Sequence, residues 1–130
     1  MNILAIESAS TICGVALFLE NKLIEIDEIN KSRVHGERIP LIVDKLIKKY
    51  AFSLSDLDGI AVSSGPGSYT GLRIGMSFAK GLAMAARIPI IPIPTLEVIN
   101  HNLNDKGSYY ILLYSHKNLV FQQLFKNGKP

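Results

Sequence analysis

The hydrophobic pattern changes its period once along the chain, and this change is the strongest constraint on the fold. Up to residue 30, apolar residues come in three short runs, 2–6, 13–19 and 23–29, joined by short links. Short links between successive strands predict an antiparallel meander. From His35 onward the apolar residues recur every three or four positions, which predicts a helix ending near Tyr50. The chain therefore combines a strand-rich beginning with a helical continuation.

Strands and helices alternate in the next segment. We expect a buried parallel strand over 59–63, a helix over 70–86, a strand over 90–93 and a short helix over 95–101 capped by Thr95. Helices that link parallel strands cross over in the right-handed sense. This order predicts an α/β fold with a mixed sheet, in which three antiparallel strands precede parallel strands with crossover helices. It resembles the ribonuclease H-like lobe of actin-like proteins.

The strand pattern restarts after the third expected helix. Residues 109–114 and 119–125 are expected to form a hairpin. Two-lobed members of the actin-like superfamily repeat their lobe, and this hairpin would open the second copy. We therefore divide the chain into a ribonuclease H-like N-terminal lobe, 1–104, and a β-hairpin opening of a truncated second lobe, 105–130.

Composition excludes several classes of protein. With 48% hydrophobic and 19% charged residues, the chain is not intrinsically disordered. No apolar run approaches the ~20 residues that span a bilayer, and the N-terminus lacks the basic region of a signal peptide. We therefore expect a cytoplasmic protein with no membrane contact. The single cysteine excludes an internal disulfide and a cysteine-rich zinc site, and the histidines form no ligand pair, so no metal site is expected.

The glycine-rich loop over residues 64–68 lies between an expected strand and the start of an expected helix. Such a position is a natural anion site. The loop lacks the lysine of a phosphate-binding P-loop, and Gly71 comes one position too late for the dinucleotide fingerprint. Two interpretations stay open: Gly65 and Gly67 permit a sharp turn, or they contact a nucleotide or phosphate.

The turn from Glu7 to Ser10 offers a second half for such a nucleotide site. In actin-like kinases the same place holds an acid that binds a metal-bound water, followed by a glycine and a hydroxyl residue. Here the acid is Glu7, Ala9 replaces the glycine, and Ser10 supplies the hydroxyl. The candidate nucleotide site is therefore Glu7, Ser10, Gly65 and Gly67, and a hydrogen-bonded hairpin turn is the alternative interpretation.

The expected helix over 70–86 is apolar on nearly every side. Glycine and alanine recur at intervals of four, and a helix with so few polar residues must be covered on more than one side. Its own sheet covers one side. The other side is covered either by the first helix or by a second protein chain, since small residues allow close helix approach.

Basic residues concentrate in 31–50, where Arg38, Lys45 and Lys48 form either a solvated helix face or a contact to RNA phosphates.

Five stretches resemble the TsaB (YeaZ) family, in order over residues 1–100. They read ILAIES from Ile3, HGER from His35, LSDLDGIAV from Leu54, GPGSYTGLRIG from Gly65 and AKGLA from Ala79. The GPGSYTGLRIG stretch is highly specific to this family. The resemblance implies a protein that helps to make threonylcarbamoyladenosine on tRNA. Its paralogue TsaD, the catalytic subunit, binds metal through a histidine pair, and Thr95 and Ile99 occupy those two positions here.

The resemblance implies a non-catalytic subunit that docks onto a TsaD-type subunit through its first two helices. It also implies a TsaE-type ATPase in a larger complex, a homodimer when the chain is alone, and indirect contact with tRNA. No cofactor is implied beyond ATP and magnesium in the assembled complex. The expected interface consists of eight residues on the two helices: Leu41, Leu72, Arg73, Gly75, Met76, Ala79, Lys80 and Ala83.

Family members usually carry a whole second lobe, whereas only a hairpin is expected after the first lobe here. Two rival functions stay open. One is a small actin-like ATPase or phosphotransferase that uses Glu7, Ser10 and the loop at Gly65 and Gly67. The other is an orphan lobe that associates with itself.

Overall fold

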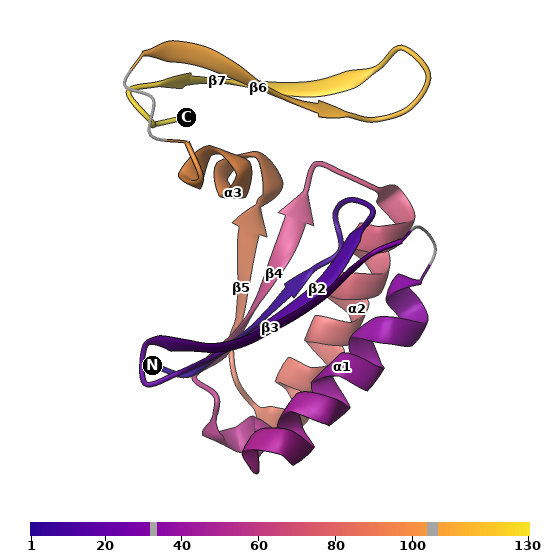
Figure 1. Ribbon diagram of the computed structural model, residues 1–130, viewed down its shortest axis with the longest axis vertical. Coiled ribbons are helices and arrows are strands. Elements are labelled where there is room, and N and C mark those ends of the chain that lie inside the picture. Colours follow the sequence, from indigo (N-terminus) through magenta and orange to yellow (C-terminus); the bar gives the residue numbers. More distant parts are fainter. Residues whose placement is uncertain (32–33, 104–106) are drawn as a thin grey trace.

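The computed structural model describes residues 1–31, 34–103 and 107–130, and within them it holds a five-stranded sheet, a two-stranded hairpin and three α-helices (Figure 1). The strands are β1 (Ile3–Glu7), β2 (Ile12–Leu19), β3 (Lys22–Asn30), β4 (Gly59–Gly65), β5 (Ile90–Pro94), β6 (Ser108–Tyr114) and β7 (Val120–Lys126). The helices are α1 (His35–Tyr50), α2 (Tyr69–Ala86) and α3 (Thr95–His101), with a short 3₁₀ turn, η1 (Leu54–Asp56), before β4.

The large sheet has the order β3-β2-β1-β4-β5. Strands β1, β2 and β3 pair antiparallel, whereas β4 pairs parallel with β1 and with β5. Because successive residues of a strand point to opposite faces, Leu4 and Ile6 face one side of the sheet and Ala5 faces the other. The meander, the parallel strands and the crossover helices expected from the sequence are confirmed.

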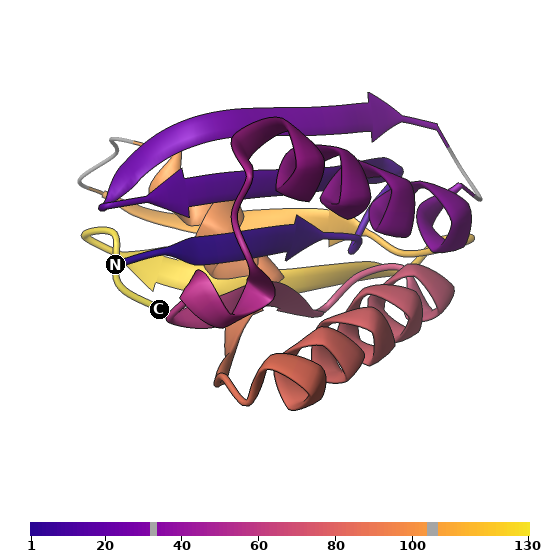
Figure 2. The same cartoon turned by 90° about the horizontal axis from the view of Figure 1, so that it is seen from below.

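Helices α1 and α2 cover the same face of this sheet (Figure 2). The main hydrophobic core lies between them and the sheet, and it includes Leu4, Val15, Ile39, Leu46 and Ile60, all almost fully buried. The apolar residues of α1 recur at helical spacing, so its inward stripe meets the inward row of each strand. None of the described helices is both long and apolar enough to span a membrane.

Helix α3 begins at Thr95, but Thr95 does not cap it. The residue at the cap position is Pro94, and no side chain there accepts a hydrogen bond from the helix. The hydroxyl of Thr95 is instead buried, with no hydrogen-bond partner. The expected cap is therefore wrong, because Thr95 already lies inside the first turn, where its own N–H is one of the free donors.

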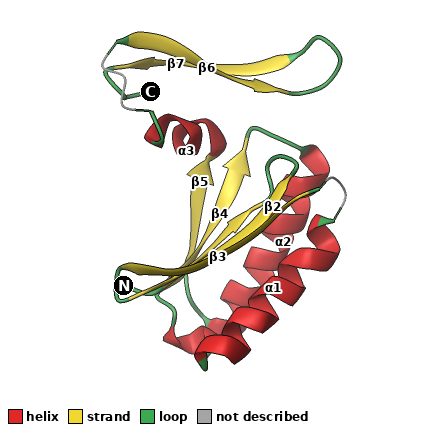
Figure 3. Ribbon diagram, in the orientation of Figure 1, coloured by secondary structure: helices red, strands yellow, loops and turns green. Residues whose placement is uncertain are grey.

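The hairpin of β6 and β7 packs on α3 rather than on the large sheet (Figure 3). Leu96, Ile111 and Phe125 form a second, small hydrophobic cluster. The Tyr109 hydroxyl donates to Asn100 Oδ1 at 2.7 Å, and the Tyr109 ring stacks on Phe125 with centroids 6.2 Å apart. The hairpin is confirmed. The boundary between 104 and 105 lies outside the described residues and stays a prediction.

Candidate functional site: the glycine loop and the helical layer

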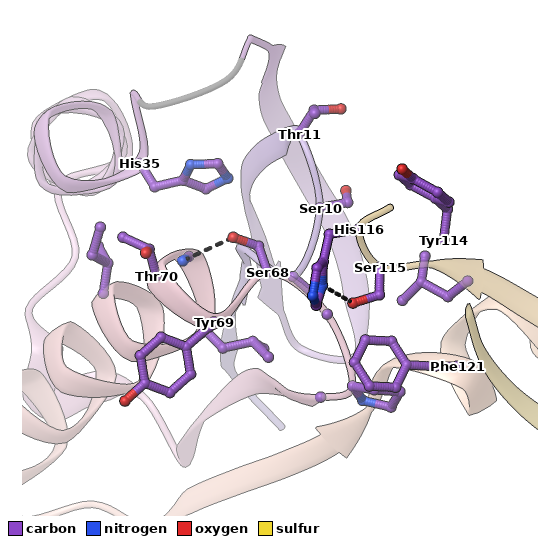
Figure 4. A pocket seen from close by; sticks show the side chains of 18 of the residues that line it. Ser10, Thr11, His35, Ser68, Tyr69, Thr70, Tyr114, Ser115, His116 and Phe121 are labelled. Carbon is purple, nitrogen blue, oxygen red and sulfur yellow. Dashed lines mark hydrogen bonds between the residues drawn. The ribbon is translucent and has the colours of Figure 1, made fainter. Parts of the chain in front are cut away.

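A cavity of about 1180 Å³ separates the first lobe from the tip of the hairpin (Figure 4). Its walls come from three places: the β1–β2 turn, the loop from β4 into α2, and the tip of the hairpin. Ser10, Gly65 and Gly67 line the first-lobe side, and Tyr114 and His116 line the hairpin side. The parallel strands β1 and β4 end at this cavity, which is where open α/β sheets hold their ligands.

The glycine loop is shaped by contacts to its own chain. Gly65 has a φ of +103°, a conformation that side chains with a Cβ rarely adopt. At Gly67 a Cβ would lie 2.3 Å from the carbonyl oxygen of Ala9. The Ser68 N–H donates to that same oxygen at 2.6 Å, and the Ser68 hydroxyl accepts from the Gly71 N–H at 3.2 Å, which caps α2. The sharp-turn interpretation of Gly65 is confirmed, and a nucleotide contact stays a prediction.

The β1–β2 turn sits against two further glycines of α2. A Cβ at Gly71 would lie 2.2 Å from the Ser8 carbonyl oxygen, and a Cβ at Gly75 would lie 2.1 Å from the Ser8 hydroxyl oxygen. Ser8 is fully buried, and its hydroxyl has no hydrogen-bond partner. The glycines of the GPGSYTGLRIG stretch thus let the helix touch the turn directly, which is a packing role.

Glu7 points away from the cavity. One of its carboxylate oxygens accepts from the Ala9 N–H at 2.5 Å, and the other accepts from the Ser63 hydroxyl. This is the hydrogen-bonded turn that the sequence offered as the alternative. The structure therefore brings Ser10, Gly65 and Gly67 together at the cavity but leaves Glu7 out of its walls.

Two histidines belong to the cavity. His35 is buried at the start of α1, with its Nε2 3.1 Å from the Ile12 carbonyl oxygen. His116 lies at the hairpin tip, with its Nδ1 2.9 Å from the Ser115 hydroxyl. Among the described residues, no three of the histidine, cysteine, aspartate and glutamate side chains come close enough together to hold a metal ion. Sequence reasoning missed the wall formed by the hairpin, although the expected restart of the lobe was the signal for it.

The outer face of α1 and α2 holds only part of the expected interface. Leu41, Arg73 and Lys80 are exposed, and Leu72 and Met76 are half-buried. Three expected members face the sheet instead: Gly75, Ala79 and Ala83. Ala79 is 0% exposed, because the stripe of small residues packs against β1 and β4 of its own sheet. These three residues are therefore wrong as partner contacts.

Two exposed apolar side chains on the same helix were not expected. Tyr69 is 74% exposed and Met84 is 79% exposed. Tyr69 lines a hollow of about 360 Å³ between α2 and the end of β4. Leu72, Arg73, Met76 and Lys80 line it from successive turns of α2, and Ser63 and Ser64 line it from β4. Four of the eight expected interface residues thus share one surface feature.

The expected RNA-contacting residues lie on the exposed side of α1. Arg38 is exposed. Lys45 pairs with Asp27 of β3, and Lys48 pairs with Asp44 one turn away at 2.7 Å. The bond to Asp27 raises the pKa of Lys45, which stays a cation. Because two of the three cations are paired with acids, the net positive potential of this face is small, and RNA contact stays a prediction.

Comparisons with known proteins find relatives among TsaB and TsaD proteins. The family model described as "TsaD: tRNA N6-adenosine threonylcarbamoyltransferase" matches residues 25–120. The tRNA threonylcarbamoyladenosine biosynthesis protein TsaB of Escherichia coli is 40% identical over 96 residues, which cover 74% of this chain and 41% of the relative. TsaB of Bacillus subtilis is 33% identical over 136 aligned positions, which cover 95% of this chain and 59% of the relative.

Solved structures agree with the sequence relatives. YeaZ from Pseudomonas aeruginosa superposes with a TM-score of 0.81 and 25% identity, covering 98% of this chain and 62% of that chain. The chain thus spans about half the length of the curated relatives it matches. The chain belongs to the TsaB (YeaZ) family and has its ribonuclease H-like, actin-like fold.

Proposed function

We propose that this chain is a non-catalytic subunit of the machinery that makes threonylcarbamoyladenosine on tRNA. Its part is to bind the catalytic, TsaD-type subunit through the outer face of α1 and α2. The observation that carries the proposal is the stripe along α2, where Tyr69, Leu72, Arg73, Met76 and Lys80 line one hollow. An exposed aromatic ring beside a basic flank is typical of a binding surface.

The chemistry of the stripe indicates what the partner presents. The Arg73 guanidinium lies 5.3 Å from the centre of the Tyr69 ring and donates to the Tyr69 hydroxyl at 3.0 Å, so the two side chains hold each other in place. A partner that presents an apolar side chain surrounded by acidic residues would complement this pair. Burying Tyr69 and Met84 would contribute about 1.5–3 kcal/mol each before the cost of association.

The proposal is tested by copurification with the TsaD-type subunit from the same cell. We expect Arg73→Glu to reduce the bound fraction at least tenfold, since a desolvated charge of the wrong sign opposes binding. The matched control is Tyr110→Glu, which places the same charge on the outer face of the hairpin and should leave the complex intact. Retention of the complex by Arg73→Glu, or equal loss in both variants, contradicts the proposed surface.

The wider assembly is also part of the proposal. A TsaE-type ATPase would join the complex of the two subunits, with tRNA reached indirectly, and the chain would form a homodimer when the catalytic subunit is absent. Sedimentation with and without that subunit separates this arrangement from an orphan lobe that only self-associates.

Contact with RNA is tested by replacing Arg38, Lys45 and Lys48 together with glutamate. If these residues contact RNA, the triple variant should weaken the gel shift of tRNA by the complex, and an unchanged shift contradicts the contact.

A small actin-like ATPase is the second candidate, and the cavity beside Gly65 and Gly67 favours it. Against it stands Glu7, whose two carboxylate oxygens are occupied by Ala9 and Ser63. Calorimetry with ATP and magnesium on the isolated chain decides between the two functions. Micromolar binding that is lost on Glu7→Ala supports the ATPase, and no heat of binding supports the subunit.

A further inference from the structure

The hollow between α2 and the end of β4 contains two positive charges. Arg73 and Lys80 line it from α2, and both side chains are exposed. Among the residues that the structure describes, neither of the two forms a salt bridge, whereas Lys45, Lys48 and Lys49 of α1 each pair with an acid. The residues that line the hollow include no aspartate and no glutamate, so no acid in the lining balances the two charges.

Arg73 is oriented by Tyr69, one turn before it on the same helix. The guanidinium donates to the Tyr69 hydroxyl at 3.0 Å and lies 5.3 Å from the centre of the Tyr69 ring. A guanidinium presents several N–H donors in a fixed fork, and the bond to Tyr69 uses one of them. The same fork matches the oxygens of a carboxylate or a phosphate group. Because Tyr69 already holds Arg73, less side-chain entropy is lost when an anion binds.

Three serines add hydroxyl groups to the lining of the hollow. Ser63 is buried and donates to a carboxylate oxygen of Glu7, so its proton is already used. Ser64 of β4 and Ser77 of α2 are exposed, and their hydroxyls can donate to a ligand in the hollow. Hydrogen-bond donors therefore reach the hollow from the strand and from the helix, which lie against each other (Figure 1).

The charge and the size of the hollow favour a phosphate group over a carboxylate. A phosphate ester carries about −1.5 to −2 charges at pH 7 and has three strong acceptor oxygens. A carboxylate carries a single charge and would leave one of the two cations unbalanced. The volume of about 360 Å³ falls within the range of small-molecule sites, about 300–1,000 Å³. Leu72 and Met76 supply an apolar side, against which the carbon part of such a ligand can pack.

We propose that the hollow binds inorganic phosphate or the phosphate group of a small molecule, held by Arg73, Lys80 and the two exposed serines. RNA does not suit this place. Its phosphates repeat along the strand and require a track of cations, whereas the lysines of α1 named above are paired with acids.

This inference goes beyond the proposed function, and it is measured on the chain alone. Both proposals use Arg73, so phosphate in the hollow should compete with the catalytic subunit. Phosphate binding to the chain, combined with copurification that phosphate does not reduce, would contradict the proposed docking surface and leave the phosphate site standing. Failure of the chain to bind phosphate would contradict the phosphate site alone.

The experiment titrates the full chain with inorganic phosphate and follows the backbone amides by nuclear magnetic resonance. Sodium chloride keeps the ionic strength constant, because salt alone changes the attraction between exposed charges. We expect saturable shifts confined to the amides at the end of β4 and in the first three turns of α2. Arg73→Gln and Lys80→Gln should each raise the dissociation constant for phosphate at least about fivefold, since each removes charged hydrogen-bond donors.

Arg87→Gln is the matched control, because it removes the same charge from the far end of α2, outside the hollow. This variant should bind phosphate like the unaltered chain. Equal weakening by Arg87→Gln, or shifts that do not saturate, would mean that phosphate is attracted only by the net charge of the chain, and would overturn the proposal.

Three further ligands identify the class of anion. Acetate that shifts the same amides as strongly as phosphate overturns the assignment, because the hollow would then select carboxylates. A single-stranded RNA oligonucleotide that shifts them when phosphate does not overturns it too. Glycerol phosphate distinguishes the two sources of phosphate: tighter binding than inorganic phosphate supports an ester whose carbon chain packs on Leu72 and Met76, and equal binding supports the free anion.

Discussion

Gly71 and Gly81 lie on the same helix, and a methyl group is expected to have opposite effects at the two positions. At Gly71 a Cβ would lie 2.2 Å from the Ser8 carbonyl oxygen, a backbone atom that cannot move without shifting the β1–β2 turn. At Gly81 nothing lies within 4 Å. We expect Gly71→Ala to lower the free energy of unfolding by about 1–3 kcal/mol, the usual cost of overpacking.

Gly81→Ala is the matched control for this prediction. An exposed glycine inside a helix costs about 0.5–1 kcal/mol relative to alanine, so the substitution should raise the free energy of unfolding by that amount. Urea denaturation followed by circular dichroism measures both changes. A Gly71→Ala protein as stable as the unaltered chain would show that the helix and the turn are not in direct contact.

Glu25 gives the chain a pH-dependent stability. Hydrogen bonds from Lys49 and from the Tyr50 hydroxyl hold the pKa of Glu25 below its ordinary value. A carboxyl with a lowered pKa stabilises the fold above its unfolded pKa of about 4.3, and this contribution is lost as the pH falls through the folded pKa. We expect Glu25→Gln to flatten the loss of stability below about pH 4.5.

The same cluster behaves in the opposite sense at high pH. The hydrogen bond to Glu25 raises the pKa of Lys49, so its contribution is present below the unfolded value and disappears as the pH rises through the folded one. Thermal unfolding of the unaltered chain and of Glu25→Gln, measured at acid pH and at high pH, checks the expected direction of both stability changes. Curves that stay parallel at acid pH would show that the Glu25 contacts do not form in solution.

At the scale of elements, local pattern was enough to find nearly every strand and helix. Helix α1 begins at His35 and ends at Tyr50, as its apolar spacing predicts. The pattern of α2 identified which residues share a face, the stripe that includes Gly75 and Ala79. It did not identify what covers that face, because the cover is Ser8 and the sheet, far away in the sequence. Periodicity alone therefore predicts a partner contact for a stripe that belongs to the core.

Prediction of the candidate site from the sequence has the same limit, because contacts between distant segments decide its geometry. Gly65 and Gly67 were recognisable from the strand–loop–helix order, and both line the cavity. The orientation of Glu7 was not recognisable, since it depends on the Ser63 hydroxyl of a neighbouring strand. The position of Tyr114 and His116 at the cavity depends in turn on how the hairpin packs on α3. Local periodicity contains no information on such contacts between distant segments.

At the scale of the whole molecule, the two hydrophobic clusters differ greatly in size. Fifteen buried residues form the core between the large sheet, α1 and α2, whereas only three, Leu96, Ile111 and Phe125, form the buried cluster between the hairpin and α3, where the Tyr109–Asn100 hydrogen bond adds to it. A two-stranded hairpin is marginally stable unless it packs on something else. The hairpin therefore depends on Phe125, which is fully buried, and we expect it to open before the sheet unfolds.

Phe125→Ala tests this order of events. Truncating a buried phenylalanine lowers the free energy of unfolding by about 3–5 kcal/mol. So small a cluster does not stabilise the hairpin by that much, so the hairpin should detach while the first lobe stays folded. Amide hydrogen exchange should then show lost protection in β6 and β7 and unchanged protection in β1 and β4. Phe121→Ala, on the same strand but partly exposed, should preserve both. Simultaneous loss of protection in both sheets would mean that the chain unfolds as one cooperative unit.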